Sequence, residues 1–304
     1  MWRNSILLLL LLALAPMARA DERLLKQPFA SRSLNAARNV RVYLPPSYYT
    51  EPQRRYPVLY LHDGQNVLSS PGTNICFGWG SWELEKTVDA LCQAGKMQQI
   101  ILVAVNNSSA RYAEYSGRHH PPGTNASTAF ENYASFLVQE LKPKIDADFR
   151  TRPEPAHTAV MGSSLGGICS LVLAWEHPDV YGGAASLSGA FQVDGTNFLH
   201  HMLRPYRGKA QPTRLYLDSG VVDFTGGDDG QKLTTEAVKQ YRRIGWGNGL
   251  VHYVDAKPLK QAELEKSGLR RDKWAEAMKS QHNEFYWRLR AWRALTFLFP
   301  PANK

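Results

Sequence analysis

The chain has 304 residues, of which 43% are hydrophobic, enough to bury the core of one large domain. Lys and Arg number 36 against 27 Asp and Glu, but the basic residues are scattered or stand in short pairs such as Arg54-Arg55. This distribution argues against nucleic acid as a partner and supports only a weak preference for anionic ligands. With no linker, repeat or low-complexity tract, residues 21–304 are predicted to form a single domain.

The first twenty residues have the pattern of a secretory signal peptide. Arg3 precedes the apolar run 6–15, and Ala18-Arg19-Ala20 forms a small-x-small cleavage site. The alternative is an uncleaved anchor, but the run is well short of the roughly 20 residues that span a bilayer. We predict cleavage after Ala20 and a periplasmic or secreted mature chain without stable membrane insertion. Cleavage would remove Arg3 and Arg19, which lowers the formal net charge from +9 to +7.

Short apolar runs alternate with helix-like segments. The pattern of 39–44 predicts a half-buried strand near a sheet edge. The runs 56–61, 99–105 and 158–161 are apolar at nearly every position, as in strands buried on both faces. The other predicted elements are helices 82–94 and 130–148, strands 183–187, 214–217 and 250–254, and a final Trp-rich helix, 284–299. This order predicts a doubly wound, mostly parallel α/β sheet.

Strand 158–161 runs into Gly162-Ser163-Ser164-Leu165-Gly166-Gly167 and then into an apolar helix, 168–175. Gly-x-Ser-x-Gly in this setting is the nucleophile elbow of the α/β-hydrolase fold, where glycines permit a tight, strained turn. The alternative is a Gly-rich turn that only caps the helix, and Ser163 is the rival hydroxyl at the x position. We predict Ser164 as the nucleophile and the backbone N–H of Leu165 as an oxyanion donor.

A serine hydroxyl needs a base and an orienting acid, expected here in the order Ser, acid, His. The predicted base is His282, on the loop before the last helix. The predicted acid is Asp223, on the loop beyond Gly220 and free to reach an imidazole. Asp218, at the end of strand 214–217, is the main rival, and a Ser-His dyad stays open. The remaining candidates are the acids Asp228, Asp229, Asp255 and Glu284 and the histidines His177, His200, His201 and His252.

The loop after strand 56–61 reads His62-Asp63-Gly64-Gln65-Asn66. Gly64 permits the close approach that a second backbone oxyanion donor needs. His62 and Asp63 do not make a ligand set, so no metal or other cofactor is predicted. Loops leaving the carboxyl ends of strands also carry aromatic and polar residues, which predict a substrate pocket or, alternatively, aromatic packing under a long loop. The residues predicted to contact substrate are Trp79, Trp82, Arg111 and Tyr115.

Three cysteines leave a choice open. In an oxidising compartment Cys76 and Cys92 could pair, or all three thiols, including Cys169, could stay unpaired. Neither arrangement has the spacing of a metal site.

Together these motifs resemble the esterase family of α/β hydrolases that includes the enterochelin, feruloyl and acetyl-xylan esterases, S-formylglutathione hydrolase and the mycolyltransferases. The resemblance covers nearly all of the mature chain and implies the triad Ser164, Asp223 and His282, with Gly64 and Leu165 as oxyanion donors. One departure is segment 257–281, longer than usual and rich in Lys, Arg and Glu. It covers either the site or the outside of the sheet. The segments that resemble the family are 59–66, Arg111 with Glu114-Tyr115, 162–167, 218–223, and 282–284 with Trp287.

The predicted function is hydrolysis of a small-molecule carboxylic ester through a covalent acyl-enzyme. An acyltransferase acting on a carbohydrate or lipid acceptor would use the same triad. A non-catalytic binding module is a third possibility, against which the intact Ser, Asp and His argue. The sequence does not determine the natural ester or the oligomeric state.

Overall fold

The computed structural model describes residues 23–72, 75–116, 125–193 and 198–301. The predicted signal peptide and its cleavage site lie outside these residues. Within them, no helix combines the length and the apolar character that crossing a bilayer requires.

The described residues build one eight-stranded sheet with the strand order β1-β2-β4-β3-β5-β6-β7-β8. The first two strands pair antiparallel with each other, and β2 pairs antiparallel with β4, whereas every later pairing is parallel. The strands are β1 Leu24–Ser31, β2 Ala36–Tyr43, β3 Val58–Leu61, β4 Ile101–Val105, β5 Thr158–Ser163, β6 Gly183–Leu187, β7 Arg214–Ser219 and β8 Leu250–Val254.

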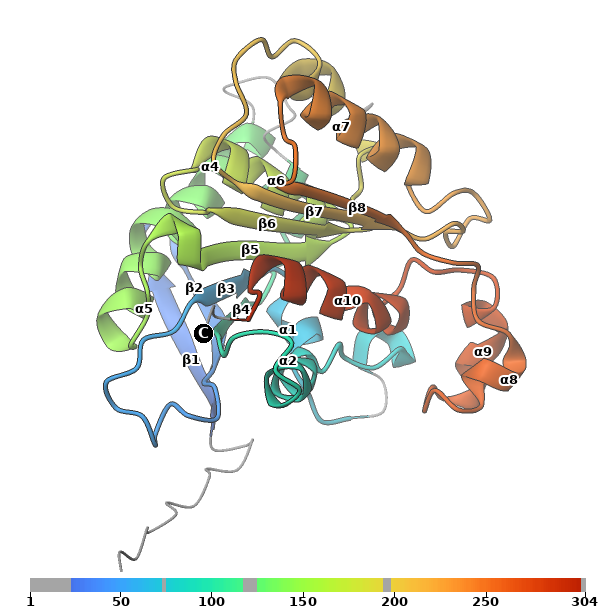
Figure 1. Ribbon diagram of the computed structural model, residues 1–304, viewed down its shortest axis with the longest axis horizontal. Helices are drawn as coiled ribbons and strands as arrows, with labels where there is room; N and C mark the ends of the chain where they lie inside the picture. The colour runs from blue at the N-terminus through green and yellow to red at the C-terminus, as the bar shows by residue number, and fades with distance from the viewer. Residues whose placement is uncertain (1–22, 73–74, 117–124, 194–197, 302–304) are drawn as a thin grey trace, which may run out of the picture.

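Helices cover both faces of this sheet (Figure 1). One face packs against α4, α6 and α7 in a core that includes Tyr133, Leu171 and Tyr241. The other face packs against α2 and α10 in a core that includes Val88 and Leu295. The α-helices are α1 Gly64–Val67, α2 Leu84–Gln93, α3 Arg111–Ser116, α4 Asn125–Ser135, α5 Lys142–Asp148, α6 Leu165–Glu176, α7 Gln231–Ile244, α8 Gln261–Leu264, α9 Trp274–Ala277 and α10 Glu284–Leu298. The 3₁₀ and π-helical segments are η2 Ile75–Gly78, η4 Phe136–Leu141, η5 Pro155–His157, η7 Phe198–Leu203 and η8 Arg271–Lys273.

This architecture confirms the predicted α/β-hydrolase fold with a mostly parallel, doubly wound sheet. The fully apolar runs became the central strands β3, β4 and β5, whose residues are buried throughout. Strand β1, which sequence patterning missed, is an edge strand with half of its positions exposed, so it lacks an apolar signature. The predicted helix 130–148 is three successive segments, α4, the π-helical η4 and α5.

The carboxyl ends of three neighbouring strands lie level with one another. Ser163 of β5 pairs with Leu187 of β6, and Leu187 pairs with Asp218 of β7. The backbone N–H of Ser164 donates to Leu187 at 2.9 Å, and that of Ser188 donates to Asp218 at 3.0 Å. This register places Ser164 and Ser188 side by side at the edge of the sheet where ligands bind in α/β folds.

Segment 257–281 forms a small helical unit at one end of the molecule, with α8 and α9 standing away from the sheet in Figure 1. It has its own apolar cluster, in which Leu264, Leu269 and Ala277 pack against Trp79 and Phe285. This packing attaches the unit to the loop before α2 and to the start of α10.

Cys76, Cys92 and Cys169 are all unpaired. The sequence left open whether Cys76 and Cys92 pair or all three thiols stay free, and in the structure all three are free.

Candidate active site

Ser164 occupies the sharp turn between β5 and α6, with φ 54° and ψ −122°. This left-handed backbone is costly for a residue with a Cβ and is typical of a nucleophile elbow. Gly162 and Gly167 make the turn possible, because a Cβ on Gly162 would lie 2.6 Å from the backbone of Gly166 and one on Gly167 would lie 2.6 Å from the Ser186 hydroxyl. The strained turn holds the Ser164 hydroxyl above the end of the sheet.

Ser164 begins a chain of hydrogen bonds through His282 to a carboxylate. The Nε2 atom of His282 lies 3.1 Å from the Ser164 hydroxyl, and Nδ1 lies 2.5 Å from Oδ1 of Asp229. An ionised carboxylate can only accept, so Nδ1 carries the proton and Nε2 is free to accept from Ser164. Two of the predicted residues, Ser164 and His282, are therefore brought together.

The predicted acid, Asp223, is not in this chain. Its Oδ1 atom instead accepts from the backbone N–H groups of Thr225 and Gly227 at 2.8 and 3.0 Å, which closes a turn of its own loop. The carboxylate that reaches His282 comes from Asp229, six residues later, immediately before α7. Asp229 rather than Asp223 therefore contacts His282, because the first half of the loop turns back on itself and only the second half returns to the sheet.

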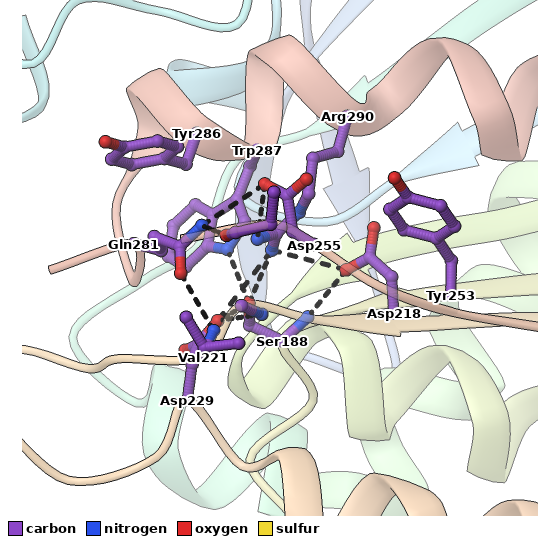
Figure 2. Close-up of polar contacts among 12 residues, drawn as sticks. Ser188, Asp218, Val221, Asp229, Tyr253, Asp255, Gln281, Tyr286, Trp287 and Arg290 are labelled. Carbon is purple, nitrogen blue, oxygen red and sulfur yellow. Dashed lines mark hydrogen bonds and ion pairs between the residues drawn. The ribbon is translucent and has the colours of Figure 1, made fainter. Parts of the chain in front are cut away.

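The rival Asp218 is also elsewhere, since it is fully buried at the end of β7 and paired with Arg290 at 3.2 Å. Figure 2 shows this ion pair beside Asp229 and Ser188. Burial raises the pKa of Asp218, against the opposing charge of Arg290. Asp218 is connected to Asp229 through Arg290 and makes no contact with the His282 imidazole among the described hydrogen bonds.

The Asp229 carboxylate is held on both oxygens. Besides the contact of Oδ1 with His282, its Oδ2 atom accepts from the backbone N–H of Gly220 at 2.6 Å and from the Ser188 hydroxyl at 2.5 Å. Burial by itself would raise the pKa of Asp229, but His282, Arg290 and Ser188 outweigh it and hold the pKa below its ordinary value. Asp229 is therefore ionised at neutral pH and geometrically fixed.

The loop that carries His282 is fixed by the residue before it. Gln281 donates its backbone N–H to Val222 at 2.8 Å, and its side-chain oxygen accepts from the N–H of Val221 at 2.8 Å. Its amide group also donates to the carbonyl of Ala256 at 2.6 Å, just beyond β8. Gln281 thus joins the loops after β7 and β8 and sets the position of His282.

The predicted oxyanion donors lie on either side of Ser164. Leu165 is the first residue of α6, where a backbone N–H has no acceptor within the helix. Gly64 follows β3, and a Cβ there would lie 2.6 Å from the backbone of Ala104 in β4. Gly64 therefore packs against the sheet, and the residues of this turn that line the cavity are Asp63, Gln65 and Asn66.

A cavity of about 890 Å³ opens over Ser164 and His282. Trp79 and Trp82, both predicted to contact substrate, line it. Phe77 and Phe224 stand at its border with 88% and 71% of their surface exposed, and the Phe224 ring lies 5.7 Å from that of His282. The described lining of the cavity is thus partly aromatic, with Phe77, Trp79, Trp82, Phe224 and Trp287.

Segment 257–281 forms another part of the wall. Lys273 and Glu276 line the cavity, and the Lys273 ammonium lies 4.8 Å from the centre of the Trp79 ring and 3.2 Å from Glu276. The sequence allowed this segment to cover either the site or the outside of the sheet, and in the structure it lies at the site.

The charged groups of the cavity are largely paired with each other. Arg111, predicted to contact substrate, does line the cavity, but both oxygens of Asp63 accept from it, at 2.7 and 2.8 Å. Glu284 lines the same region, and its side chain accepts from Asn66 at 3.2 Å. Burial, reinforced by the charge of Asp63, raises the pKa of Glu284 to about 7. Among the residues that the structure describes, the cavity therefore presents little free positive charge.

The last predicted contact residue, Tyr115, lies below the cavity floor. It is fully buried, its hydroxyl accepts from the backbone N–H of Asp63 at 3.2 Å, and its ring packs between His62 and Tyr133. Burial lowers the pKa of His62 to about 4, so this imidazole is neutral. Tyr115 and His62 support the loop after β3, and the described residues contain no cluster able to hold a metal ion.

The chain matches the family described as "Putative esterase" over residues 31–293. Among curated proteins, an endo-1,4-beta-xylanase/feruloyl esterase of Xylanibacter ruminicola is 27% identical over 172 residues, which cover 53% of this chain and 21% of that protein. A solved ferulic acid esterase superposes with a TM-score of 0.63 at 18% identity, covering 91% of this chain and 97% of its own. The enterobactin esterase of Shigella flexneri superposes with a TM-score of 0.67 at 16% identity, and the match covers 93% of this chain and 59% of the esterase chain.

Proposed function

The chain belongs to this esterase family and is a carboxylic ester hydrolase, and on that premise we propose that Ser164, His282 and Asp229 form its catalytic triad. The observation that carries the proposal is the unbroken hydrogen-bonded chain from the Ser164 hydroxyl through His282 to Asp229. In that chain the imidazole has its free nitrogen toward the serine, which is the tautomer a general base requires.

The three residues have different roles in the proposed reaction. The Ser164 oxygen attacks the ester carbonyl while Nε2 of His282 takes the hydroxyl proton, and Asp229 stabilises the resulting imidazolium. When the tetrahedral intermediate collapses, the imidazolium gives that proton to the departing alkoxide, and the acyl group stays on Ser164. Water, deprotonated by the same nitrogen, then attacks the acyl-enzyme, and the acid is released as Ser164 regains its proton.

The developing oxyanion would be held by backbone N–H groups on both sides of the serine. The N–H of Leu165 at the start of α6 supplies one donor, with the positive end of the helix behind it. We assign the second to the turn that begins at Gly64. Within this turn Gln65 is the better candidate, because it lines the cavity whereas Gly64 packs against β4.

The walls of the cavity favour an aromatic ester without multiple negative charges. Phe77 and Phe224, which line the cavity with 88% and 71% of their surface exposed, offer flat apolar surfaces on which an aryl group could stack. Within the described part of the chain, the cavity is lined by two Lys or Arg residues, Arg111 and Lys273, and each is paired with a carboxylate. A feruloyl-type ester therefore suits the site better than a polyanionic ferric catecholate.

The test is a panel of p-nitrophenyl esters, a feruloyl ester, an acetylated sugar and a ferric catecholate trilactone, assayed with wild type, Ser164→Ala and Ser163→Ala. Ser164→Ala should lower kcat on the order of 10⁴-fold or more on every substrate that turns over. Ser163→Ala should keep kcat within about tenfold, since its hydroxyl is not in the hydrogen-bonded chain. Full activity in Ser164→Ala would refute the mechanism.

An acyltransferase would give a different result in the same panel. Hydrolysis would be absent, and the acyl group would move to an added carbohydrate or lipid acceptor. We propose hydrolysis because the cavity is open at the Phe77 and Phe224 border, where water has access to Ser164.

We also propose that the protein is exported. The support is the leader pattern of residues 1–20 and its cleavage site at Ala20. Fractionation of expressing cells with N-terminal mass analysis should find a mature protein that begins at Asp21, and a full-length chain in the cytoplasm would contradict this.

A further inference from the structure

Ser188, the first residue after β6, lies beside Asp229 (Figure 2) and contacts its Oδ2 atom, whereas His282 contacts Oδ1. It is 1% exposed, and its backbone has φ 45°, a left-handed conformation that is unfavourable for serine. Its backbone N–H donates both to the carbonyl of Asp218 and to the Asp218 side chain, at 3.0 and 3.2 Å. A strained, fully buried residue beside the proposed acid calls for a functional explanation.

The hydrogen bonds of the Ser188 hydroxyl fix where its proton points. The Nη2 atom of Arg290 lies 2.6 Å from the hydroxyl oxygen, and the Nε1 atom of Trp287 lies 3.1 Å from it. A guanidinium and an indole N–H can only donate, so together they occupy both lone pairs of the hydroxyl. Its single proton is left for the third neighbour, Oδ2 of Asp229 at 2.5 Å.

We propose that Ser188 is a positioning residue for ester hydrolysis, and that its hydroxyl, aligned by Arg290 and Trp287, fixes Asp229 so that this carboxylate holds His282 toward Ser164. The inference rests on the proposed function of the triad. Ser188 acts through Asp229 and does not touch the reacting atoms.

The arrangement does more than fill space, because the donated proton also controls charge. The Ser188 proton and the Gly220 N–H draw negative charge toward Oδ2 and away from Oδ1, which faces His282. Without the hydroxyl, more charge would remain on Oδ1 and would favour the protonated imidazole. The extra charge on Oδ1 would stabilise the imidazolium, and a protonated imidazole cannot act as a base.

Arg290 has a second role in the same network. It is 1% exposed and lies between the carboxylates of Asp218, Asp229 and Asp255, at 3.2, 3.9 and 3.8 Å. The guanidinium offsets the charge of these acids where water cannot, and its contact with Asp218 keeps Nη2 aimed at Ser188. The buried ion pair therefore connects the end of β7 to the orientation of the hydroxyl.

Two substitutions at Ser188 separate the hydroxyl from the backbone. Ser188→Ala removes the hydroxyl and keeps the Cβ, whereas Ser188→Gly removes both and relieves the strain of the positive φ. The matched control is Ser186→Ala, two residues earlier in β6, since the Ser186 hydroxyl is buried and has no hydrogen-bond partner among the described residues. Each variant is assayed on p-nitrophenyl acetate from pH 5 to 9, with its unfolding temperature measured in parallel.

Both Ser188 variants should lose roughly tenfold in kcat, the effect of one hydrogen bond to a charged group, with KM within about twofold of wild type. The midpoint of the acidic limb of kcat/KM should move upward by about half a pH unit. Ser188→Gly should show these changes even if it is as stable as wild type, and Ser186→Ala should show neither.

Two results would overturn the inference. One is a kcat and pH profile in both Ser188 variants equal to those of wild type. The other is a lower kcat without any movement of the acidic limb, which would mean that Ser188 only supports the fold. Ser164→Ala in the same series distinguishes the two proposals, because an inactive Ser164→Ala beside a fully active Ser188→Ala refutes only the role of Ser188.

Discussion

Replacing Asp229 by Asn should trap His282 in the wrong tautomer. The Oδ2 position faces the backbone N–H of Gly220 at 2.6 Å, and a backbone N–H can only donate. The asparagine side chain introduced by Asp229→Asn must therefore keep its carbonyl oxygen there and turn its amide NH₂ toward Nδ1 of His282, where Oδ1 now lies at 2.5 Å. The imidazole would then accept at Nδ1 and carry its proton on Nε2, facing Ser164.

An imidazole in that tautomer cannot take the Ser164 proton, so kcat should fall on the order of 10⁴-fold at neutral pH. KM should change little, since Asp229 does not line the large cavity. The assay is steady-state hydrolysis of p-nitrophenyl acetate, with thermal unfolding to confirm that the variant is folded.

Asp223→Asn is the matched control, with the same chemical change six residues away. Its carboxylate only closes the turn at Thr225 and Gly227, so kcat should stay within about threefold of wild type. If Asp229→Asn kept kcat within tenfold while Asp223→Asn or Asp218→Asn lost activity, the assignment of the acid from the geometry would be wrong.

Two further predictions concern stability. Because burial raises the pKa of Glu284 from 4.5 to about 7, the folded protein binds this proton more tightly than the unfolded chain does, and the free energy of unfolding falls as pH rises between these values. The Glu284→Gln variant has no carboxyl group to titrate, so its free energy of unfolding should not fall in this way. Measured by urea denaturation, its stability relative to wild type should improve by up to about 3 kcal/mol from pH 5 to pH 8. The same stability difference between variant and wild type at both pH values would contradict the raised pKa of Glu284. Gly64→Ala would place a Cβ 2.6 Å from the Ala104 backbone and should cost about 3 kcal/mol or prevent folding, whereas Gly247→Ala, with no atom within 4 Å, should behave like wild type in the same denaturation measurement.

The central strands and the elbow could be predicted from sequence because local physics determines them. Strands β3, β4 and β5 are buried on both faces, so their apolar runs have no polar alternation to confuse the pattern. The elbow needs glycine at Gly162 and Gly167 for steric reasons that act within a few residues. Similarly, the contact of His282 with Ser164 could be anticipated because His282 lies on the loop directly before a recognisable final helix.

The acid could not be found in the same way. Asp218 lies at the end of β7, Asp223 and Asp229 lie on the loop that follows, and the sequence allows any of them to reach His282. The choice depends on a turn closed by Thr225 and Gly227 and on the backbone N–H of Gly220, which are contacts between loop residues with no periodic signature.

The partners behind the acid are harder still to predict. Ser188 follows an ordinary apolar strand, and Arg290 stands in a helix that contains two arginines besides it. Only the packing of α10 against the sheet shows that Arg290 is buried while Arg288 and Arg293 are not.

The net charge of the chain and the charge of its cavity lead to different expectations about the ligand. A formal +7 on the mature chain suggested a weak preference for anions, but a global sum does not say where charge meets substrate. At the cavity Asp63 neutralises Arg111, Glu276 pairs with Lys273, and Glu284 is poised to ionise near neutral pH. An anionic ester would therefore gain little from the basic residues of the wall and, above pH 7, would meet the Glu284 carboxylate. We therefore expect the described lining of the cavity, with its paired charges and aromatic side chains, to decide which esters reach Ser164.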